Sequence, residues 1–476
     1  MNTQVIALRQ PHRVDRPSLI PRRSKPRPWV IFGVVALGLL MSSLDQTIVA
    51  TALNTLQAEL RTSIALASWT MTVYALGMLL MLPVAGKLSE QFGRRRVFIA
   101  SVALFTAASL CCGLATNIYM LVALRFVQAL GGAGLTPSAT GIIADHFGRS
   151  RDKALGLFGS IFSIGAMIGP IFGGLFVTYW SWRGIFFVNV PIGIALIVLG
   201  LRTIPADPPR SRRHPANFDL PGMAMLGVGI LGAMLAFNAL GDGGHGFTSP
   251  QFLAPAAAAL LGLALFAHHA RASAHPFILP RFLAGRGFRA VNAVNVIGGM
   301  IENGLIALVP VYATTRYGIS ALDSGSLLTG EGVAIILTGG AAAFALRRTG
   351  YRLPILVGMI AMVAGVFALA LDPHDISPYA WLAAVTGLIG LGAGCLSPAS
   401  RNAGLQLAPE NTPMLAAIRT MCFQIGAIIA IAITTAGVSG APDAGAGYAH
   451  ADLIWGALFL LLIPISLRVP EHRGAW

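Results

Sequence analysis

The stretch Gly86-Lys-Leu-Ser-Glu-Gln-Phe-Gly-Arg-Arg-Arg96 lies between two apolar runs, residues 67–86 and 97–115. Each run has about the 20 mostly apolar residues that a membrane-spanning helix needs. Gly86 and Gly93 permit a tight reversal of the chain, and consecutive arginines favour the cytoplasmic side of a membrane. The stretch therefore predicts a short cytoplasmic loop between two transmembrane helices.

The rest of the chain repeats this alternation of apolar runs and short polar connections. Only 11% of the 476 residues are charged, whereas an ordinary soluble domain has about 25%. No run shows the alternating pattern of a membrane barrel strand. We therefore predict an all-α polytopic membrane protein with 14 transmembrane helices. The predicted spans cover residues 29–52, 67–86, 97–115, 118–144, 154–178, 184–201, 220–240, 251–270, 290–315, 322–346, 353–371, 379–399, 412–436 and 451–467.

The distribution of positive charge predicts the orientation. The formal net charge is +15, which in a soluble protein would suggest nucleic acid. If both termini lie in the cytoplasm, 28 of the 33 Lys and Arg residues fall in cytoplasmic tails and loops. Only Arg61, Arg183 and Arg316 lie on the other side, while Arg125 and Arg419 fall inside spans. Because positive loops remain cytoplasmic during insertion, topology explains the charge and no nucleic-acid partner is predicted.

Other chemistry has little support in the sequence. All four cysteines fall within apolar runs and none has CxxC spacing, so neither a disulfide framework nor a metal site is predicted, and no cofactor is expected. The first 28 residues hold seven basic residues. We predict a disordered cytoplasmic tail there, which orients the first helix or contacts anionic lipid.

Five stretches, in order, resemble signatures of one transporter family. The loop at residues 86–96 is similar to the G-x-L-x-D-x-x-G-R-[KR] motif of the major facilitator superfamily, with Glu90 in place of the usual aspartate. Of the other four, the stretches that begin at Leu44, Gly165 and Trp182 resemble motifs of the 14-helix drug:proton antiporter branch of that family, and the stretch that begins at Arg125 is similar to R-x-x-Q-G-x-G, with Ala129 in place of a glycine. The four stretches are Leu44-Asp-Gln-Thr-Ile-Val49, Arg125-Phe-Val-Gln-Ala-Leu-Gly131, Gly165-Ala-Met-Ile-Gly-Pro-Ile-Phe-Gly-Gly174 and Trp182-Arg-Gly-Ile-Phe-Phe-Val-Asn-Val-Pro-Ile-Gly193.

The resemblance implies a major facilitator fold of two six-helix bundles with two inserted helices. The expected divisions are a basic cytoplasmic tail (1–28), an N-terminal bundle (29–201), a linker with the inserted helices (202–289), a C-terminal bundle (290–467) and a second cytoplasmic tail (468–476). The second-half counterpart of the first loop, residues 347–352, lacks an acidic residue. We therefore expect the C-terminal half to be less tightly held.

The resemblance also implies a cytoplasmic gate. We assign to this gate Gly86, Glu90, Gly93, Arg94 and Asp145. From the residues themselves, we expect Glu90 to accept hydrogen bonds from the end of a neighbouring helix.

The glycine pattern of the fifth span predicts close helix packing. Gly165, Gly169 and Gly173 recur every four residues and so share one helix face, where another backbone can approach closely. Pro170 removes one hydrogen bond of the helix. With Gly174, these residues form the antiporter motif and suit a gating helix, although ordinary small-residue packing would give the same pattern.

Ionisable residues within spans need a partner or a function, because a charge in the bilayer centre is costly. Asp45 and Arg125 lie at similar predicted depths, about 10 Å from the outer end of their spans. We hypothesise that they form a pair facing the N-terminal cavity and that Asp45 exchanges a proton when the pair opens. A permanent structural ion pair is the alternative.

Three further ionisable residues fall within spans of the second half. Glu302 and Glu331 are candidates for binding a lipophilic cation or a second proton. The alternatives are that each is protonated and hydrogen-bonded at a helix interface, or that it faces solvent. Arg419 lies one helical turn before Phe423, which occupies the arginine position of the family's R-Q-L-G motif.

The function that follows is proton-coupled export of hydrophobic, cationic or amphipathic drugs by alternating access. Export of an endogenous lipid or secondary metabolite is the alternative, and a membrane enzyme or sensor would need a catalytic cluster or soluble domain that the sequence does not show. The expected partners are protons, a hydrophobic small molecule and membrane lipid. We expect a monomer in the bacterial cytoplasmic membrane, with both termini in the cytoplasm.

Overall fold

A computed structural model describes residues 28–62, 64–207, 219–241, 248–274, 276, 278–373, 375–439 and 443–471. These residues form helices and turns, with no strand among them. The basic tail before Pro28 and residues 208–218 at the start of the linker lie outside the described residues. Within the described ranges, 12 helices are long and apolar enough to cross a membrane. The prediction of an all-helical membrane protein is therefore confirmed.

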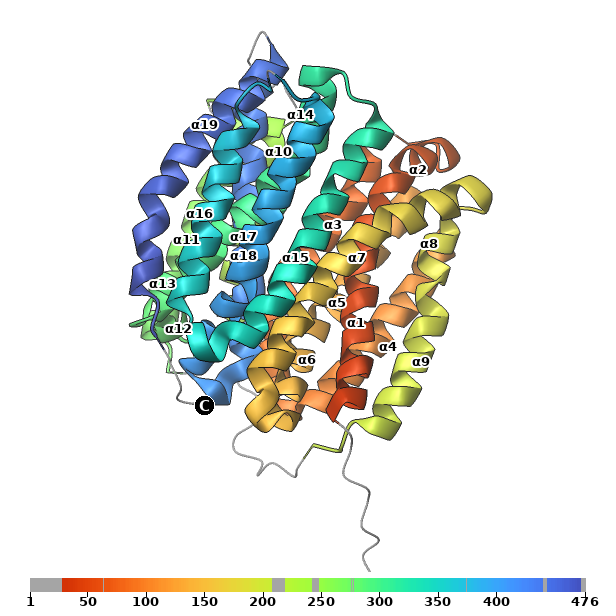
Figure 1. The fold of residues 1–476 in the computed structure, drawn as a ribbon. Coiled ribbons are helices and arrows are strands. Elements are labelled where there is room, and N and C mark those ends of the chain that lie inside the picture. Colours follow the sequence, from red (N-terminus) through yellow and green to blue (C-terminus); the bar gives the residue numbers. More distant parts are fainter. Residues whose placement is uncertain are drawn as a thin grey trace, which may run out of the picture.

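The helices of the first half lie together on one side of the molecule (Figure 1). Two predicted spans are each divided into two helices, because the ladder of helix hydrogen bonds is interrupted near Gly134 and Val188. The elements are α1 (Pro28–Ile48), η1 (Val49–Ala52), α2 (Leu53–Glu59), α3 (Ile64–Phe92), α4 (Arg94–Gly113), α5 (Ile118–Ala133), α6 (Leu135–His146), η2 (Gly148–Ser150), α7 (Arg151–Tyr179), α8 (Arg183–Phe187) and α9 (Asn189–Thr203).

The helices of the second half pack beside them. Figure 1 shows that the start of α1 and the end of the last element, η5 (Ile463–Arg468), lie at the same lower end of the molecule. The elements are α12 (Pro280–Ala284), α13 (Phe288–Gly299), η3 (Met300–Leu305), α14 (Ile306–Tyr317), α15 (Ala321–Thr349), α16 (Arg352–Leu369), α17 (Pro378–Gln406), η4 (Pro409–Asn411), α18 (Thr412–Ser439), α19 (Ala444–Leu462) and η5 (Ile463–Arg468).

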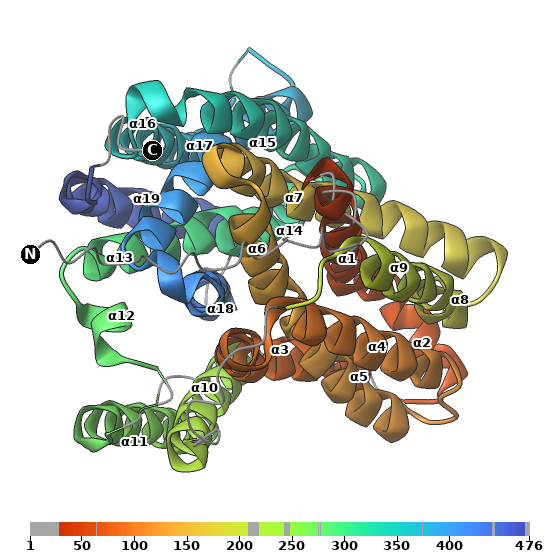
Figure 2. The same cartoon turned by 90° about the horizontal axis from the view of Figure 1, so that it is seen from below.

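Two helices between the halves form a hairpin at the edge of the molecule. These are α10 (Leu220–Gly241) and α11 (Pro250–Ala272), and α10 lies beside α3 (Figure 2). Asp219 holds the hairpin at its lower end, since its Oδ1 accepts a hydrogen bond from the Gly222 amide (2.9 Å) and lies 2.6 Å from His269 Nε2 on α11. The 12 helices counted above do not include α7 and α10, although both cover predicted spans.

The loops that precede α4 and α16 are built in the same way. Each contains a glycine with positive φ, Gly93 at 100° and Gly350 at 72°, a conformation that favours glycine. Asp207, which follows the last helix of the first half, accepts bonds from the Arg95 and Arg96 amides, both at 3.2 Å.

Glu471 makes the corresponding contact with a backbone amide in the second half. It follows the last helix of that half and accepts a bond from the Tyr351 amide at 2.7 Å. Arg352 Nε donates to the Val469 carbonyl at 2.6 Å. The loop at residues 347–352 contains no acid of its own, and the carboxylate that contacts it comes from a residue 120 positions away along the chain. The expectation that the C-terminal half is less tightly held stays a prediction.

The predicted glycine face of α7 packs against α1. A Cβ at Gly165 would meet Ser43, one at Gly169 would meet Thr47, and one at Gly173 would meet Thr51 and the Ile48 carbonyl. Gly174 faces elsewhere and has no heavy atom within 4 Å of such a Cβ. The prediction that these three glycines share one face and allow close packing is confirmed. Helix α7 continues through Pro170, whose side chain lies outside the described part.

Replacing Gly173 by alanine tests this packing. The new Cβ would lie 2.7 Å from the Ile48 carbonyl oxygen, so α1 and α7 must separate, and we expect a loss of about 1–3 kcal/mol of stability. Gly174→Ala is the matched control and should be neutral or slightly stabilising, because alanine favours the helix. Thermal unfolding of the purified protein in detergent, followed by tryptophan fluorescence, measures both. Equal melting temperatures would contradict the packing.

Candidate functional site

Asp45 and Arg125 form a buried ion pair within the first half. Arg125 Nη1 lies 2.7 Å from Asp45 Oδ2, and the side chains are 1% and 0% exposed respectively. Asp45 comes from α1 and Arg125 from α5. The predicted contact is therefore present. The expectation that the pair faces a cavity was wrong, because neighbouring helices enclose it completely.

Two amide side chains complete the hydrogen bonding of the Asp45 carboxylate, and a serine hydroxyl contacts both amides. Gln128 Nε2 donates to Asp45 Oδ1 at 2.9 Å and Asn189 Nδ2 donates to the same atom at 3.0 Å. Both amides also contact Ser109 Oγ, at 3.1 and 3.0 Å, and Arg125 Nη1 donates to Gln128 Oε1 at 2.8 Å. A buried ion pair is retained only when its remaining polar atoms are satisfied in this way.

The sequence contained part of this network. Gln128 and Asn189 belong to two of the quoted motifs, but their roles could not be inferred, because the residues come from different helices. Ser109 had no motif to indicate it. Tyr74 was also missed, and its ring lies beneath the Arg125 guanidinium at 4.1 Å from the centroid.

The predicted gate residues meet at the lower end of the molecule. Glu90 Oε1 accepts a hydrogen bond from the Met414 amide at 3.3 Å, in the first turn of α18, where unpaired amides favour a carboxylate. Arg94 Nη1 forms an ion pair with Asp145 Oδ2 at 2.6 Å. The predicted contact of Glu90 with a helix end is present, and it joins the first half to the second.

Further contacts between the halves lie at the same end. A Cβ at Gly86 of α3 would lie 3.0 Å from the Met414 Cα of α18. Arg151 Nη2 donates to Thr412 Oγ1 at 3.0 Å. The Lys153 ammonium of α7 lies 4.1 Å from the ring centroid of Phe344 on α15. Two helices of each half therefore close this end of the molecule.

Glu302 lies where a helix of the second half is locally widened. The segment Met300–Leu305 is a π-helix, a rare form that occurs frequently at functional sites. Among the residues that the structure describes, Glu302 Oε2 is buried without a hydrogen-bond partner. Glu302 lies within electrostatic reach of Arg419, and Glu331 lies within reach of Glu302. The structure therefore brings all three predicted residues of the second half into one cluster.

Two ionisable residues of the second half were missed because spans were predicted too short. Arg401 was counted in a cytoplasmic loop after residue 399, but α17 continues to Gln406 and carries Arg401 inside the molecule beside Arg419. Asp452 was placed at the start of the last span, but α19 begins at Ala444, which leaves Asp452 only 7% exposed. The sequence did indicate both residues, because each is a charged residue at or near the end of an apolar run.

Comparisons with known proteins agree with this architecture. The family model of the Major Facilitator Superfamily matches residues 35–431 and 291–469. The chain is 31% identical over 381 residues to the multidrug transporter protein MdtP of Bacillus subtilis, covering 79% of this chain and 68% of that protein. It is also 31% identical over 407 residues to a multidrug resistance protein B homolog of Mycobacterium tuberculosis, covering 84% of this chain and 74% of that protein.

The fold is also that of a solved structure. The crystal structure of the human organic anion transporter MFSD10 (TETRAN) matches 93% of this chain and 100% of that chain, with a TM-score of 0.68 and 17% sequence identity. Together with the family match, these similarities show that the chain is a multi-pass membrane protein that belongs to the Major Facilitator Superfamily.

Proposed function

We propose that this protein is a proton-coupled antiporter that exports hydrophobic, cationic or amphipathic drugs by alternating access. The observation that supports this most directly is the closure of the two halves at one end, by contacts among α3, α7, α15 and α18, combined with buried ionisable groups in both halves. Relatives named multidrug transporter and multidrug resistance protein favour drugs as the cargo.

The proposed membrane arrangement has 14 spans, with α7 and α10 completing the set. They are 29 and 22 residues long, about 44 and 33 Å at 1.5 Å per residue, which is enough to cross the hydrocarbon core. The closed lower end carries the arginines of the α3–α4 loop and so faces the cytoplasm of a bacterial cell. We divide the chain into two six-helix bundles, residues 29–201 and 290–467, with α10 and α11 inserted between them.

Coupling requires that proton binding and cargo binding favour different conformations of the transporter. When Asp45 is ionised, its three hydrogen bonds hold α1, α5 and α9 together. Protonation removes the charge that attracts Arg125 and so favours rearrangement of these helices. A proton from outside and a cargo molecule from the cytoplasm then bias the same equilibrium in opposite directions.

Neutralising Asp45 tests the proton step. We expect Asp45→Asn to reduce ethidium efflux from inverted vesicles with an imposed pH gradient by about tenfold or more, because the mutant can no longer exchange a proton there. Asp372→Asn, which removes an exposed acid paired with Arg316, is the matched control and should transport normally. Expression of each variant is measured by immunoblotting.

Unchanged gradient-driven efflux in Asp45→Asn would show that Asp45 is a structural residue only. The same vesicles separate the two kinds of cargo. Transport of membrane lipids or metabolites in the absence of ethidium transport would favour the alternative function.

A disulfide across the closed end tests alternating access. A Cβ at Gly86 would lie 3.3 Å from the Ala417 Cβ, close to the spacing of about 3.5–4.5 Å found in disulfides. We expect Gly86→Cys/Ala417→Cys, in a background without the four native cysteines, to form a bond that abolishes efflux. Reduction with dithiothreitol should restore it, and Gly86→Cys alone should be insensitive to oxidation. Full transport by the oxidised double mutant would rule out opening at this end.

The buried acids of the second half are candidates for recognising positive charge. Because a carboxylate in a low dielectric attracts cations strongly, we expect Glu302→Gln/Glu331→Gln to lose resistance to cationic drugs selectively, by about tenfold in inhibitory concentration. Minimum inhibitory concentrations for cationic and uncharged drugs measure this. Equal loss for both groups of drugs would contradict a role in charge recognition.

A further inference from the structure

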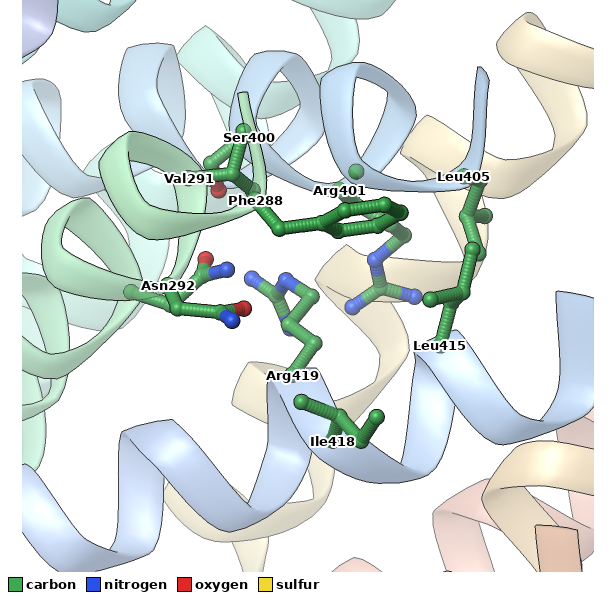
Figure 3. A pocket seen from close by; sticks show the side chains of 11 residues that line it. Phe288, Val291, Asn292, Ser400, Arg401, Leu405, Leu415, Ile418 and Arg419 are labelled. Carbon is green, nitrogen blue, oxygen red and sulfur yellow. The ribbon is translucent and has the colours of Figure 1, made fainter. Parts of the chain in front are cut away.

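A small cavity in the second half is lined by two arginines. It lies between α13, α17 and α18, and Figure 3 shows the Arg401 and Arg419 guanidinium groups pointing into it, with Phe288 and Asn292 beside them. Its volume is about 10 Å³, which is enough for about one water molecule.

Carboxylates of the described chain neutralise the positive charge in this cavity only in part. Neither Arg401 nor Arg419 forms an ion pair with a described carboxylate. Arg419 donates to Ser397 Oγ at 3.0 Å and lies 4.5 Å from the centroid of Phe423, while its buried Nε has no hydrogen-bond partner in the described chain. Glu302 is within electrostatic reach of both arginines, but it is a single carboxylate facing two cations.

The contrast with the first half is informative. Arg125 is buried more completely than Arg401 or Arg419, which are partly exposed, yet it has an aspartate at 2.7 Å and further acceptors around it. A guanidinium inside a protein is normally paired, because removal from water is costly. Two neighbouring guanidiniums without acidic partners therefore indicate a site that receives an anion.

The chemistry of the two groups indicates which anion. A guanidinium presents parallel N–H donors that match the two oxygens of a carboxylate. Glu302 and Glu331, close to the same cluster, suit a positive group. The arrangement therefore fits the carboxylate of a molecule that also carries a positive charge.

We propose that Arg401 and Arg419 bind the carboxylate of a zwitterionic, amphipathic cargo. This inference rests on the proposed export function and identifies a substrate class for it. Arg401 Nη2 would lie 3.0 Å from a Cβ at Gly159 of α7, so a helix of the first half packs against this arginine. When the lower end opens, α7 moves away and the cavity becomes accessible from that side.

Closure then expels the cargo. In the conformation observed, the cavity accommodates about one water molecule and cannot hold a carboxylate with its attached carbon. The carboxylate thus binds more tightly to the conformation that is open at the lower end, and a difference of this kind is what allows a ligand to be moved by a change of state.

Two rhodamine dyes test the proposal. Rhodamine B is a zwitterion with a free carboxylate, whereas rhodamine 6G has the same ring system with that group esterified. Binding of each dye to the purified full-length protein is measured by fluorescence polarisation. We expect Arg401→Gln to lower the ratio of rhodamine B affinity to rhodamine 6G affinity by about tenfold or more, because a charge-assisted hydrogen bond is lost.

Several controls make the result decisive. Arg401→Lys keeps the charge and should retain part of the ratio, while Arg316→Gln, at the opposite end, should leave it unchanged. Size-exclusion profiles show whether each variant is folded. An unchanged ratio in Arg401→Gln would overturn the proposal, as would displacement of rhodamine B by phosphatidylglycerol but not by sodium acetate, since the cavity would then be a lipid site. Because binding is measured at equilibrium without a pH gradient, its outcome is independent of the ethidium efflux that tests the antiporter.

Discussion

The cost of burying charge among apolar helices constrains this molecule more than any other factor. In the first half, Asp45 and Arg125 satisfy that constraint by pairing at 2.7 Å and by sharing the amides of Gln128 and Asn189. Four helices contribute to this network, since Ser109 of α4 joins it through both amides. The network therefore fixes how these helices lie relative to one another, and any change in the charge of Asp45 affects all of them.

The second half does not meet the constraint in the same way. Glu302, Arg401 and Arg419 lie within electrostatic reach of one another, but none forms an ion pair with another described residue. The π-helix at Glu302 adds a local departure from regular backbone geometry. A transporter needs both kinds of environment, because a satisfied network holds a bundle together and an unsatisfied one can take up a proton or a charged ligand.

Close packing at glycines connects the helix that carries Asp45 to the helices that close the lower end of the molecule. Gly165, Gly169 and Gly173 bring α7 against α1, and so attach the helix that meets α15 to the helix that carries Asp45. At the lower end, Gly86 allows α3 to contact α18 directly. A rearrangement of α1 can therefore reach the contacts that close the molecule without any flexible connection.

The sequence by itself determined the helical class, the approximate positions of the long helices, with errors of up to seven residues at the ends of α17 and α19, and several of the buried acids and close-packed glycines. It could do so because apolar length, motif spacing and helical periodicity are local properties of the chain. Only the tertiary structure decided that Glu471 supplies the acid of the second loop, that Asp45 is enclosed, and that Arg401 shares a cavity with Arg419. These contacts join residues from different helices, so no local pattern encodes them. The predicted span ended at residue 399, seven residues before the end of α17 at Gln406, and this error placed Arg401 in solvent rather than in the interior.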